Sequence, residues 1–241
     1  MKKRTLLGVL TPSSNTVLEP LTQAMVADLK DVTAHFGRFR VTEISMRDQA
    51  LGQFNNEPIL EAARLLADAR VGTIIWSGTS SGWLGFDADE KLCDEIKAAT
   101  NIEASTSVLA LNEIFEMTEV KRFGLVTPYL DEIQERIIAN YQSAGYQCVA
   151  SQNLRDRGNF SFSEVTEETL MDMVRRAAEP KPDAITIFCT NLRGAGIVER
   201  MEQETGIPIY DTVATAVWKG MKVAGADPAR IKGWGRLFGE V

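Results

Sequence analysis

The chain carries a thiol where an apolar run meets a polar segment. Cys189 follows the apolar residues Ala184–Phe188 and precedes Thr190. A cysteine thiol has an ordinary pKa of about 8.5, so it is mainly protonated at neutral pH. It can then serve as a general acid, or as a base where N–H dipoles lower its pKa. The alternative is that Cys189 is a small buried hydrophobic residue, as free cysteines commonly are.

A hydroxyl-rich segment follows another apolar run. Gly78-Thr79-Ser80-Ser81-Gly82 offers backbone N–H groups and hydroxyls that could bind an anion. The segment lacks the lysine of a phosphate-binding loop and the spacing of a dinucleotide motif, so nucleotide binding is not indicated. The competing interpretation is a flexible connection between two elements.

Three other polar features could take part in function, but two of them are better explained as structural. Tyr129 follows Pro128 at a predicted helix start, where its hydroxyl could donate to an anion or its ring could simply pack. His35 is the only histidine; it is predicted to precede a strand and to be a surface or structural residue. The acidic run Asp87-Ala88-Asp89-Glu90 is predicted to cap a helix at its positive end, with no metal implied.

The composition excludes several functional classes. One histidine and three cysteines among 241 residues leave almost nothing for a histidine-based triad or a multi-histidine metal site. Cys93 and Cys148 are interpreted as packing residues, and the cysteine spacing predicts neither a disulfide framework nor a zinc site. The net charge of −7 disfavours nucleic-acid binding. No apolar stretch approaches a membrane span or a signal peptide, so we expect a cytoplasmic protein with no membrane partner.

Short apolar runs alternate with segments of helical period, which is typical of an α/β fold with parallel sheets. The predicted strands are Leu6–Leu10, Val41–Ile44, Gly72–Trp76, Glu103–Ser105, Arg122–Val126, Gln147–Ala150, Ala184–Phe188 and Ile207–Tyr210. The predicted helices are Asn15–Leu29, Glu57–Ala69, Ala88–Thr100, Ser107–Met117, Leu130–Ala144, Glu167–Ala178, Gly196–Thr205 and Thr212–Ala224. Asn15 and Asp131 are predicted to cap two of them.

The two halves of the chain echo each other. Gly8-Val9-Leu10-Thr11-Pro12 returns 116 positions later as Gly124-Leu125-Val126-Thr127-Pro128, and Gly78 precedes Cys189 by a similar 111 positions. Ligands of open α/β sheets bind beyond the carboxyl ends of the strands. We therefore expect a site in a cleft between two similar halves. Its predicted lining is Thr11–Asn15, Gly78–Ser81, Thr127–Tyr129 and Cys189–Asn191.

Several segments together resemble the aspartate/glutamate racemase superfamily, in the branch of arylmalonate decarboxylase and maleate cis-trans isomerase. They are Gly78-Thr79-Ser80, Ser105–Leu109, Thr127–Glu132, the strand end at Cys189 and the tail Gly233–Phe238. The resemblance implies two pseudo-symmetric α/β lobes, each a short parallel sheet flanked by helices, with the active site in the cleft between them. The expected lobes are residues 1–116 with the returning segment 212–241, and residues 117–211.

Racemases and isomerases of this superfamily carry one cysteine in each lobe. Here the second position is Cys189 and the first is Gly78, a pattern that resembles arylmalonate decarboxylase. The resemblance implies a decarboxylase of a malonate-type acid that forms an enediolate, protonates it from Cys189 and needs neither metal nor organic cofactor. The resemblance also implies that Pro12, Asn15, Thr79, Ser80, Tyr129 and Thr190 bind the substrate carboxylate. Further substrate contacts are expected from Gly78, Asn159 and Asn191.

Other residues depart from the decarboxylase pattern. Asn15 and Asn159 resemble isomerase positions, and Arg155–Phe160 is polar where an aryl pocket is expected. A maleate isomerase-like or other one-cysteine enzyme acting on a small dicarboxylate therefore stays open. A carboxylate-binding protein without catalysis is a third possibility. The expected partner in each case is a small carboxylic acid, and a homo-oligomer is left undecided.

Overall fold

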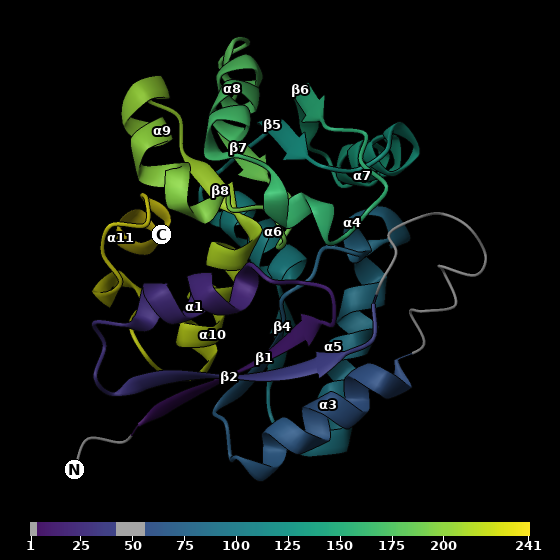
Figure 1. Ribbon diagram of the computed structural model, residues 1–241, viewed down its shortest axis with the longest axis vertical. Coiled ribbons are helices and arrows are strands. Elements are labelled where there is room, and N and C mark those ends of the chain that lie inside the picture. The colour runs from purple at the N-terminus through teal and green to yellow at the C-terminus, as the bar shows by residue number, and fades with distance from the viewer. Residues whose placement is uncertain (1–3, 42–55) are drawn as a thin grey trace.

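The computed structural model describes residues 4–41 and 56–241, whose eight strands form two four-stranded parallel sheets. The first sheet has the order β2-β1-β3-β4 and the second the order β6-β5-β7-β8 (Figure 1). The first contains β1 (Thr5–Pro12), β2 (Val32–Phe39), β3 (Thr73–Trp76) and β4 (Ala104–Thr106). The second contains β5 (Arg122–Thr127), β6 (Gln147–Asn153), β7 (Ala184–Ile187) and β8 (Ile209–Asp211).

Helices connect the strands, as parallel pairing requires. Those beside the first sheet are α1 (Leu18–Val26), α3 (Glu57–Asp68), α4 (Ser81–Leu84), α5 (Phe86–Thr100) and α6 (Ser107–Met117). Those that follow are α7 (Asp131–Ser143), α8 (Glu167–Ala178), α9 (Val198–Thr205), α10 (Thr212–Val223) and α11 (Leu237–Glu240). Short 3₁₀ turns occur at Ser161–Glu164, Ala195–Ile197 and Pro228–Arg230.

The two sheets repeat one arrangement. β1 pairs with β2 on one side and β3 on the other, and β5 pairs in the same way with β6 and β7. The two echoing segments, which begin at Gly8 and Gly124, therefore occupy equivalent central strands. The prediction of an α/β fold with two pseudo-symmetric parallel sheets flanked by helices is confirmed.

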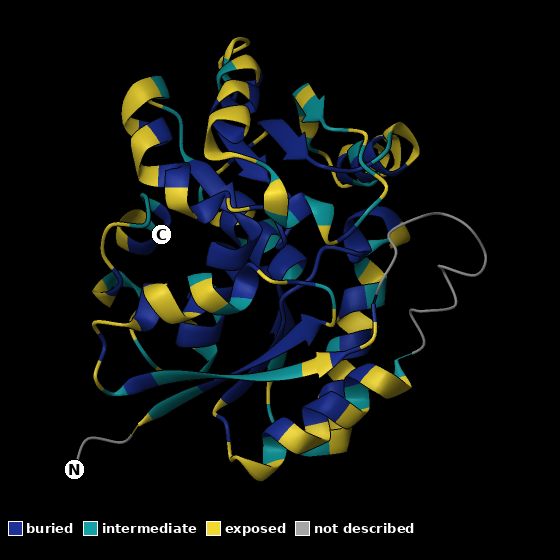
Figure 2. Cartoon of the chain, viewed as in Figure 1, coloured by how far each residue is buried: buried dark blue, intermediate teal, exposed yellow. Residues whose placement is uncertain are grey.

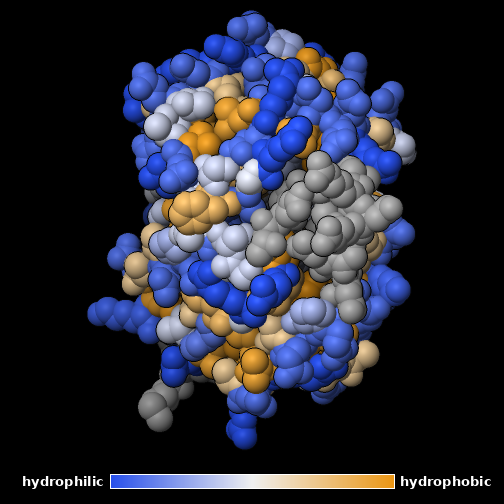
Figure 3. Space-filling model, turned by 45° about the vertical axis from the view of Figure 1, so that its right-hand side comes forward, coloured by the Kyte–Doolittle hydropathy of each residue, from blue (hydrophilic) through white to orange (hydrophobic). Residues whose placement is uncertain are grey.

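Burial follows the layering expected of such a fold. The strands β3, β7 and β8 are buried throughout, whereas helices such as α3 and α8 bury one face and expose the other (Figure 2). The face drawn in Figure 3 is mainly hydrophilic, with apolar residues in small groups. Among the described residues no helix combines the length and apolarity that a membrane crossing demands.

One predicted strand is misplaced. The second strand along the chain is β2, Val32–Phe39, and Val41 lies outside any strand, while the rest of the predicted strand Val41–Ile44 falls outside the described residues. His35, predicted to precede a strand, lies inside β2, with Nε2 3.0 Å from the Thr33 hydroxyl. β2 is an edge strand whose side chains are mostly half-exposed. It therefore lacks the continuous apolar run that marks a fully buried strand.

Neither predicted cap is the N-cap residue of its helix. Asn15 lies two residues before Val17, the N-cap of α1, although its side-chain oxygen accepts hydrogen bonds from the N–H groups of Val17 and Leu18. The helix itself is shorter than predicted, Leu18–Val26. Asp131 is not the cap of α7: it is the first helical residue, and its carboxylate accepts from Asn153 and Arg155 instead.

The C-terminal segment returns to the first sheet. Thr215 on α10 donates to the carbonyl of Ser107, at the start of α6, over 2.9 Å. The tail also reaches the second half, because the N–H of Arg236 donates to Glu202 on α9. From the contact between Thr215 and Ser107 we propose two lobes, one formed by residues 1–116 with 212–241 and the other by residues 117–211. The contact between Arg236 and Glu202 links these two lobes.

Candidate active site

A small cavity of about 30 Å³ lies beyond the carboxyl ends of strands from both sheets. Most of its wall comes from the ends of β1, β3, β5 and β7, four strands at equivalent places in the two sheets, and Val41 after β2 and Asn159 after β6 complete it. The ten residues to which the sequence assigned catalysis or ligand contact line it: Pro12, Asn15, Gly78, Thr79, Ser80, Tyr129, Asn159, Cys189, Thr190 and Asn191. The predicted lining segments were too wide, because Thr11, Ser13, Ser14, Ser81, Thr127 and Pro128 do not line the cavity. The structure brings them together, and their individual roles stay predictions.

A hydroxyl pair joins the two halves at this cavity. The Tyr129 hydroxyl lies 2.7 Å from the Thr79 hydroxyl, and either oxygen can be the donor. The same tyrosine hydroxyl interacts with the Cys189 thiol, and this interaction lowers the pKa of the thiol. The Trp83 ring meets the Tyr129 ring edge-on, with centroids 5.3 Å apart. Thr79, Tyr129 and Cys189 therefore form one connected polar group with an aromatic support.

Cys189 is held as a neutral thiol. Burial raises its pKa to about 11, against hydrogen bonds from Tyr129 and the N–H groups of Asn191 and Leu192 that lower it. Burial likewise raises the pKa of the Tyr129 hydroxyl well above its ordinary value. Both groups thus keep their protons at neutral pH. Such a thiol is suited to give a proton to a carbanion rather than to attack as a thiolate.

Amide and hydroxyl groups link the remaining walls. The Asn15 amide donates to the Thr190 hydroxyl over 3.2 Å, and that hydroxyl donates to the carbonyl of Ser77 over 3.2 Å. Asn191 accepts from the N–H of Thr16 and donates to the carbonyl of Asn159. Except for the bond between Asn191 and Asn159, which lies within the second half, these bonds cross between the two sheets, so they fix the β1 and β3 loops against the segment that follows Cys189.

A buried carboxylate holds the hydroxyl-rich loop. Asp89 is 2% exposed and accepts from the Ser81 hydroxyl over 2.7 Å and from the Thr106 hydroxyl over 2.5 Å. Burial raises the pKa of Asp89 to about 6. The prediction that this acidic run merely caps a helix is therefore incomplete: Asp89 does lie in the first turn of α5, but it anchors the segment that carries Thr79. That segment is also ordered, since α4 begins at Ser81.

Three residues of the cavity wall were not predicted from the sequence, namely Val41, Trp76 and Trp83. Trp76 ends β3 two residues before Gly78, and Trp83 lies on α4 five residues after it. Their closeness to the predicted loop was the available signal. Large aromatic residues next to a glycine-rich strand end commonly pack around the ligand site that it forms.

Other candidate positions lie elsewhere. Cys93 and Cys148 do not line the cavity, and burial raises their pKa values to about 12 and 11. Within residues 4–41 and 56–241, no cluster of three or more potential metal ligands from histidine, cysteine, aspartate and glutamate is found.

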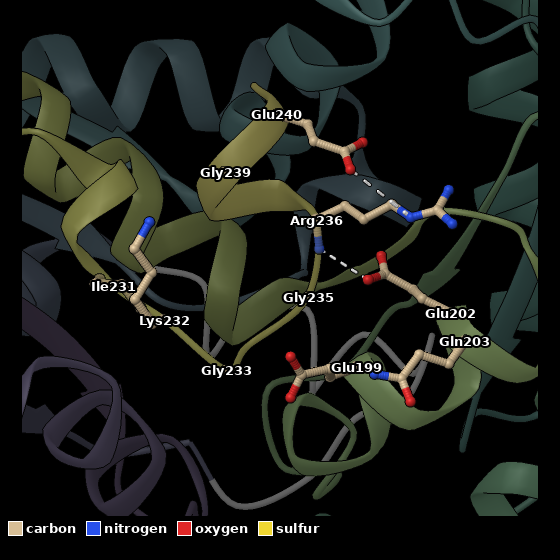
Figure 4. Close-up of a pocket in the computed structure, with 10 residues that line it drawn as sticks. All are labelled: Glu199, Glu202, Gln203, Ile231, Lys232, Gly233, Gly235, Arg236, Gly239 and Glu240. Carbon is tan, nitrogen blue, oxygen red and sulfur yellow. Dashed lines mark hydrogen bonds and ion pairs between the residues drawn. The ribbon is translucent and has the colours of Figure 1, made fainter.

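A second cavity, of about 460 Å³, lies between α9 and the C-terminal tail (Figure 4). Its buried carboxylate, Glu202, accepts from the N–H groups of Ile209 and Arg236, while the Arg236 side chain pairs with Glu240 at 4.0 Å. These polar groups attach the tail to α9. The cavity is more open than the first and lies away from the strand ends that converge on Cys189.

Comparison with known proteins agrees with the fold. The arylmalonate decarboxylase family model matches residues 7–238, so the chain belongs to this family. Arylmalonate decarboxylase of Bordetella bronchiseptica is 26% identical over 187 residues, which cover 76% of this chain and 78% of the relative. Its family contains enzymes that act on carboxylic acids.

Two solved structures share the fold over almost the whole chain. A cysteine-to-serine variant of maleate cis-trans isomerase from Nocardia farcinica, with a covalently bound succinylcysteine intermediate, has a TM-score of 0.88 at 20% identity and covers 98% of this chain and 99% of its own. A liganded double variant of arylmalonate decarboxylase, with one glycine changed to cysteine and one cysteine to serine, has a TM-score of 0.84 at 22% identity. It covers 99% of this chain and 100% of its own.

Proposed function

We propose that the protein is a cofactor-independent decarboxylase of a disubstituted malonate-type acid. The observation that carries this proposal is the single thiol of the cavity. Cys189 stands at one strand end, and the corresponding strand end of the other sheet has Gly78. The decarboxylase variant described above changes one glycine and one cysteine, the same two residue types that stand here at positions 78 and 189.

The polar group around Thr79 supplies the binding site for the retained carboxylate. The hydroxyls of Thr79, Ser80 and Tyr129, with the backbone N–H groups of Ser80 and Thr190, donate to its oxygens. Cleavage of the bond to the second carboxylate releases CO₂ and leaves the electron pair on the α-carbon, delocalised as an enediolate. Donors placed where negative charge grows stabilise that intermediate.

Cys189 completes the reaction as a general acid. Its S–H proton passes to the α-carbon, the new C–H bond forms from one face, and the thiolate recovers a proton from water. The neutral thiol that burial produces suits this step. One donor on one face gives one enantiomer.

A maleate isomerase-like activity is the second candidate, and the amides of Asn15 and Asn159 favour it. Both line the cavity and would suit a second carboxylate of a small dicarboxylate. The Nocardia structure carries a succinyl group on cysteine. In this chain the same addition would have to use Cys189, although burial keeps that thiol protonated. A non-catalytic carboxylate-binding protein is the remaining alternative.

Incubation with methylphenylmalonate, phenylmalonate and maleate, followed by NMR, tests the proposal. We expect CO₂ release from a malonate and loss of that activity in Cys189→Ala. Cys148→Ala is the matched control, because Cys148 is half-buried on β6 outside the cavity, and it should keep full activity. Formation of fumarate from maleate would contradict the proposed decarboxylase activity and support the isomerase. Ligand-induced thermal stabilisation without product would indicate the binding protein.

A further inference from the structure

Gly78 is a glycine because an aromatic side chain occupies the space beside it. A Cβ atom built on Gly78 would lie 2.0 Å from Cζ2 and 2.2 Å from Cε2 of Trp76. Real Cβ atoms do not approach ring carbons so closely. The indole therefore fills the volume that any side chain at position 78 would need, a cysteine included.

The indole cannot easily move aside. Trp76 is 3% exposed, and its ring packs against Phe39 with centroids 5.0 Å apart. It belongs to an apolar cluster with the buried residues Leu10 and Ile59. Interiors of this kind are close-packed, so a displaced indole would require several neighbours to shift.

We propose that Trp76 is the specificity-determining wall of this cavity, which takes the place of a side chain at position 78 and restricts proton transfer to Cys189. Trp76 lines the cavity from the first sheet, whereas Cys189 lines it from the second. The atoms of the indole that occupy this space, Cζ2 and Cε2, are ring carbons without an acidic proton, so this part of the wall holds no counterpart to the Cys189 thiol. The restriction of proton transfer to Cys189, which is the stereochemical half of the proposal, rests on the proposed decarboxylation. The exclusion of a side chain at position 78 by the Trp76 ring, which is the packing half, does not.

A thermodynamic cycle tests the packing half without any substrate. The four proteins are the wild type, Gly78→Cys, Trp76→Leu and the double variant that combines these two substitutions. We expect Gly78→Cys to lower the thermal unfolding midpoint by about 5 °C or more, in line with the cost of overpacking a core. In the Trp76→Leu background the same substitution should cost much less.

Gly196→Cys is the control for a new cysteine, because a Cβ there meets nothing within 4 Å. It should leave the unfolding midpoint and the activity near those of the wild type. A folded double variant beside an unfolded Gly78→Cys protein also supports the inference. Equal losses in both backgrounds, or failure of both proteins with Gly78→Cys to fold, would overturn it, because removal of the indole should create the room.

The stereochemical half is read from the product of methylphenylmalonate by chiral chromatography. We expect one enantiomer from the wild type and a mixture from the double variant, where the introduced thiol would donate to the other face of the enediolate. A mixture from Gly78→Cys alone, with an unchanged midpoint, would show that Trp76 is not the wall. Absence of decarboxylation in the wild type would refute the proposed function, while the unfolding cycle would still decide the role of Trp76.

Discussion

The hydroxyl of Tyr129 lies 2.7 Å from the hydroxyl of Thr79, and the hydrogen bond between them joins the ends of two separate sheets. Tyr129 follows β5 of the second sheet, and Thr79 follows β3 of the first. Because the Tyr129 hydroxyl also interacts with the Cys189 thiol and lowers its pKa, one oxygen connects the proposed carboxylate site with the proposed proton donor. Its removal should therefore affect catalysis more than folding.

Tyr129→Phe tests this connection. The variant keeps the ring, which packs against Trp83 and Phe162, but loses the hydroxyl. We expect kcat for the malonate substrate to fall about 100-fold, the usual effect of removing one oxyanion donor. Tyr141→Phe is the matched control, because the buried Tyr141 hydroxyl has no hydrogen-bond partner within the described residues. Equal loss of activity in both variants would contradict the assigned role of Tyr129.

Asn15→Asp tests the charge preference of the cavity. The aspartate keeps the oxygen that accepts from the N–H groups of Val17 and Leu18, so the start of α1 should survive. It loses the amide that donates to Thr190 and adds a negative charge beside the proposed substrate carboxylate. We expect KM to rise about tenfold or more through like-charge repulsion.

The matched control for that charge is Asn140→Asp. Asn140 donates to the carbonyl of Gly82 from α7 and does not line the cavity. Steady-state kinetics of both variants should show the rise in KM for Asn15→Asp alone. An unchanged KM in Asn15→Asp would mean that the substrate carboxylates lie away from this amide.

The sequence predicted the repeated sheets because local patterns encode them. Each echo combines a buried apolar run with a Thr-Pro end, and the runs that contain Gly8 and Gly124 became equivalent central strands. β2 was missed because an edge strand with half-exposed side chains has no such run. The site residues at strand ends were predictable from topology, since parallel strands bring their carboxyl ends to one edge.

The supporting contacts were not predictable in the same way. Asp89 binds Ser81 and Thr106, which are 8 and 17 positions away, and nothing in a helical acidic run distinguishes a buried member from exposed ones. The Trp76 ring fills the volume that a side chain at position 78 would need, and this depends on the rotamer and packing of that one ring. Such relationships arise from tertiary packing and are absent from local periodicity.

The pH dependence of turnover should identify Cys189 as a buried acid. Because burial raises its thiol pKa to about 11, the proton donor stays loaded through the mildly alkaline range. We expect kcat to show no alkaline decline between about pH 7 and 9.5, where a thiol with the ordinary pKa of about 8.5 would lose most of its protons. Rates at saturating substrate in overlapping buffers measure this. A decline centred near the ordinary thiol pKa would contradict it.

Asp211 should make folding stability decrease as the pH rises. Its side chain caps α10 by accepting from Val213 and Ala214 through Oδ1, whereas Oδ2 is buried without a partner among the described residues. Burial raises the Asp211 pKa from its reference value of 3.8 to about 7. Between these two values the folded state holds a proton that the unfolded state has released. The free energy of unfolding should therefore fall by about 1.4 kcal/mol per pH unit from this group alone.

Asp211→Asn removes that titration while an amide oxygen still caps the helix, so the variant should show a flatter profile between about pH 5 and 7. Asp89 titrates in the same direction over a narrower window, because its pKa is raised only to about 6. Carboxylates with lowered pKa values, such as Asp183, stabilise the fold as the pH rises, but they act mainly below their reference pKa of 3.8. Urea unfolding at one-unit intervals from about pH 5 to 8 separates these contributions. If Asp211→Asn kept the wild-type slope just below neutral pH, where Asp89 is already largely ionised, the buried carboxyl of Asp211 would not be the group that releases its proton there.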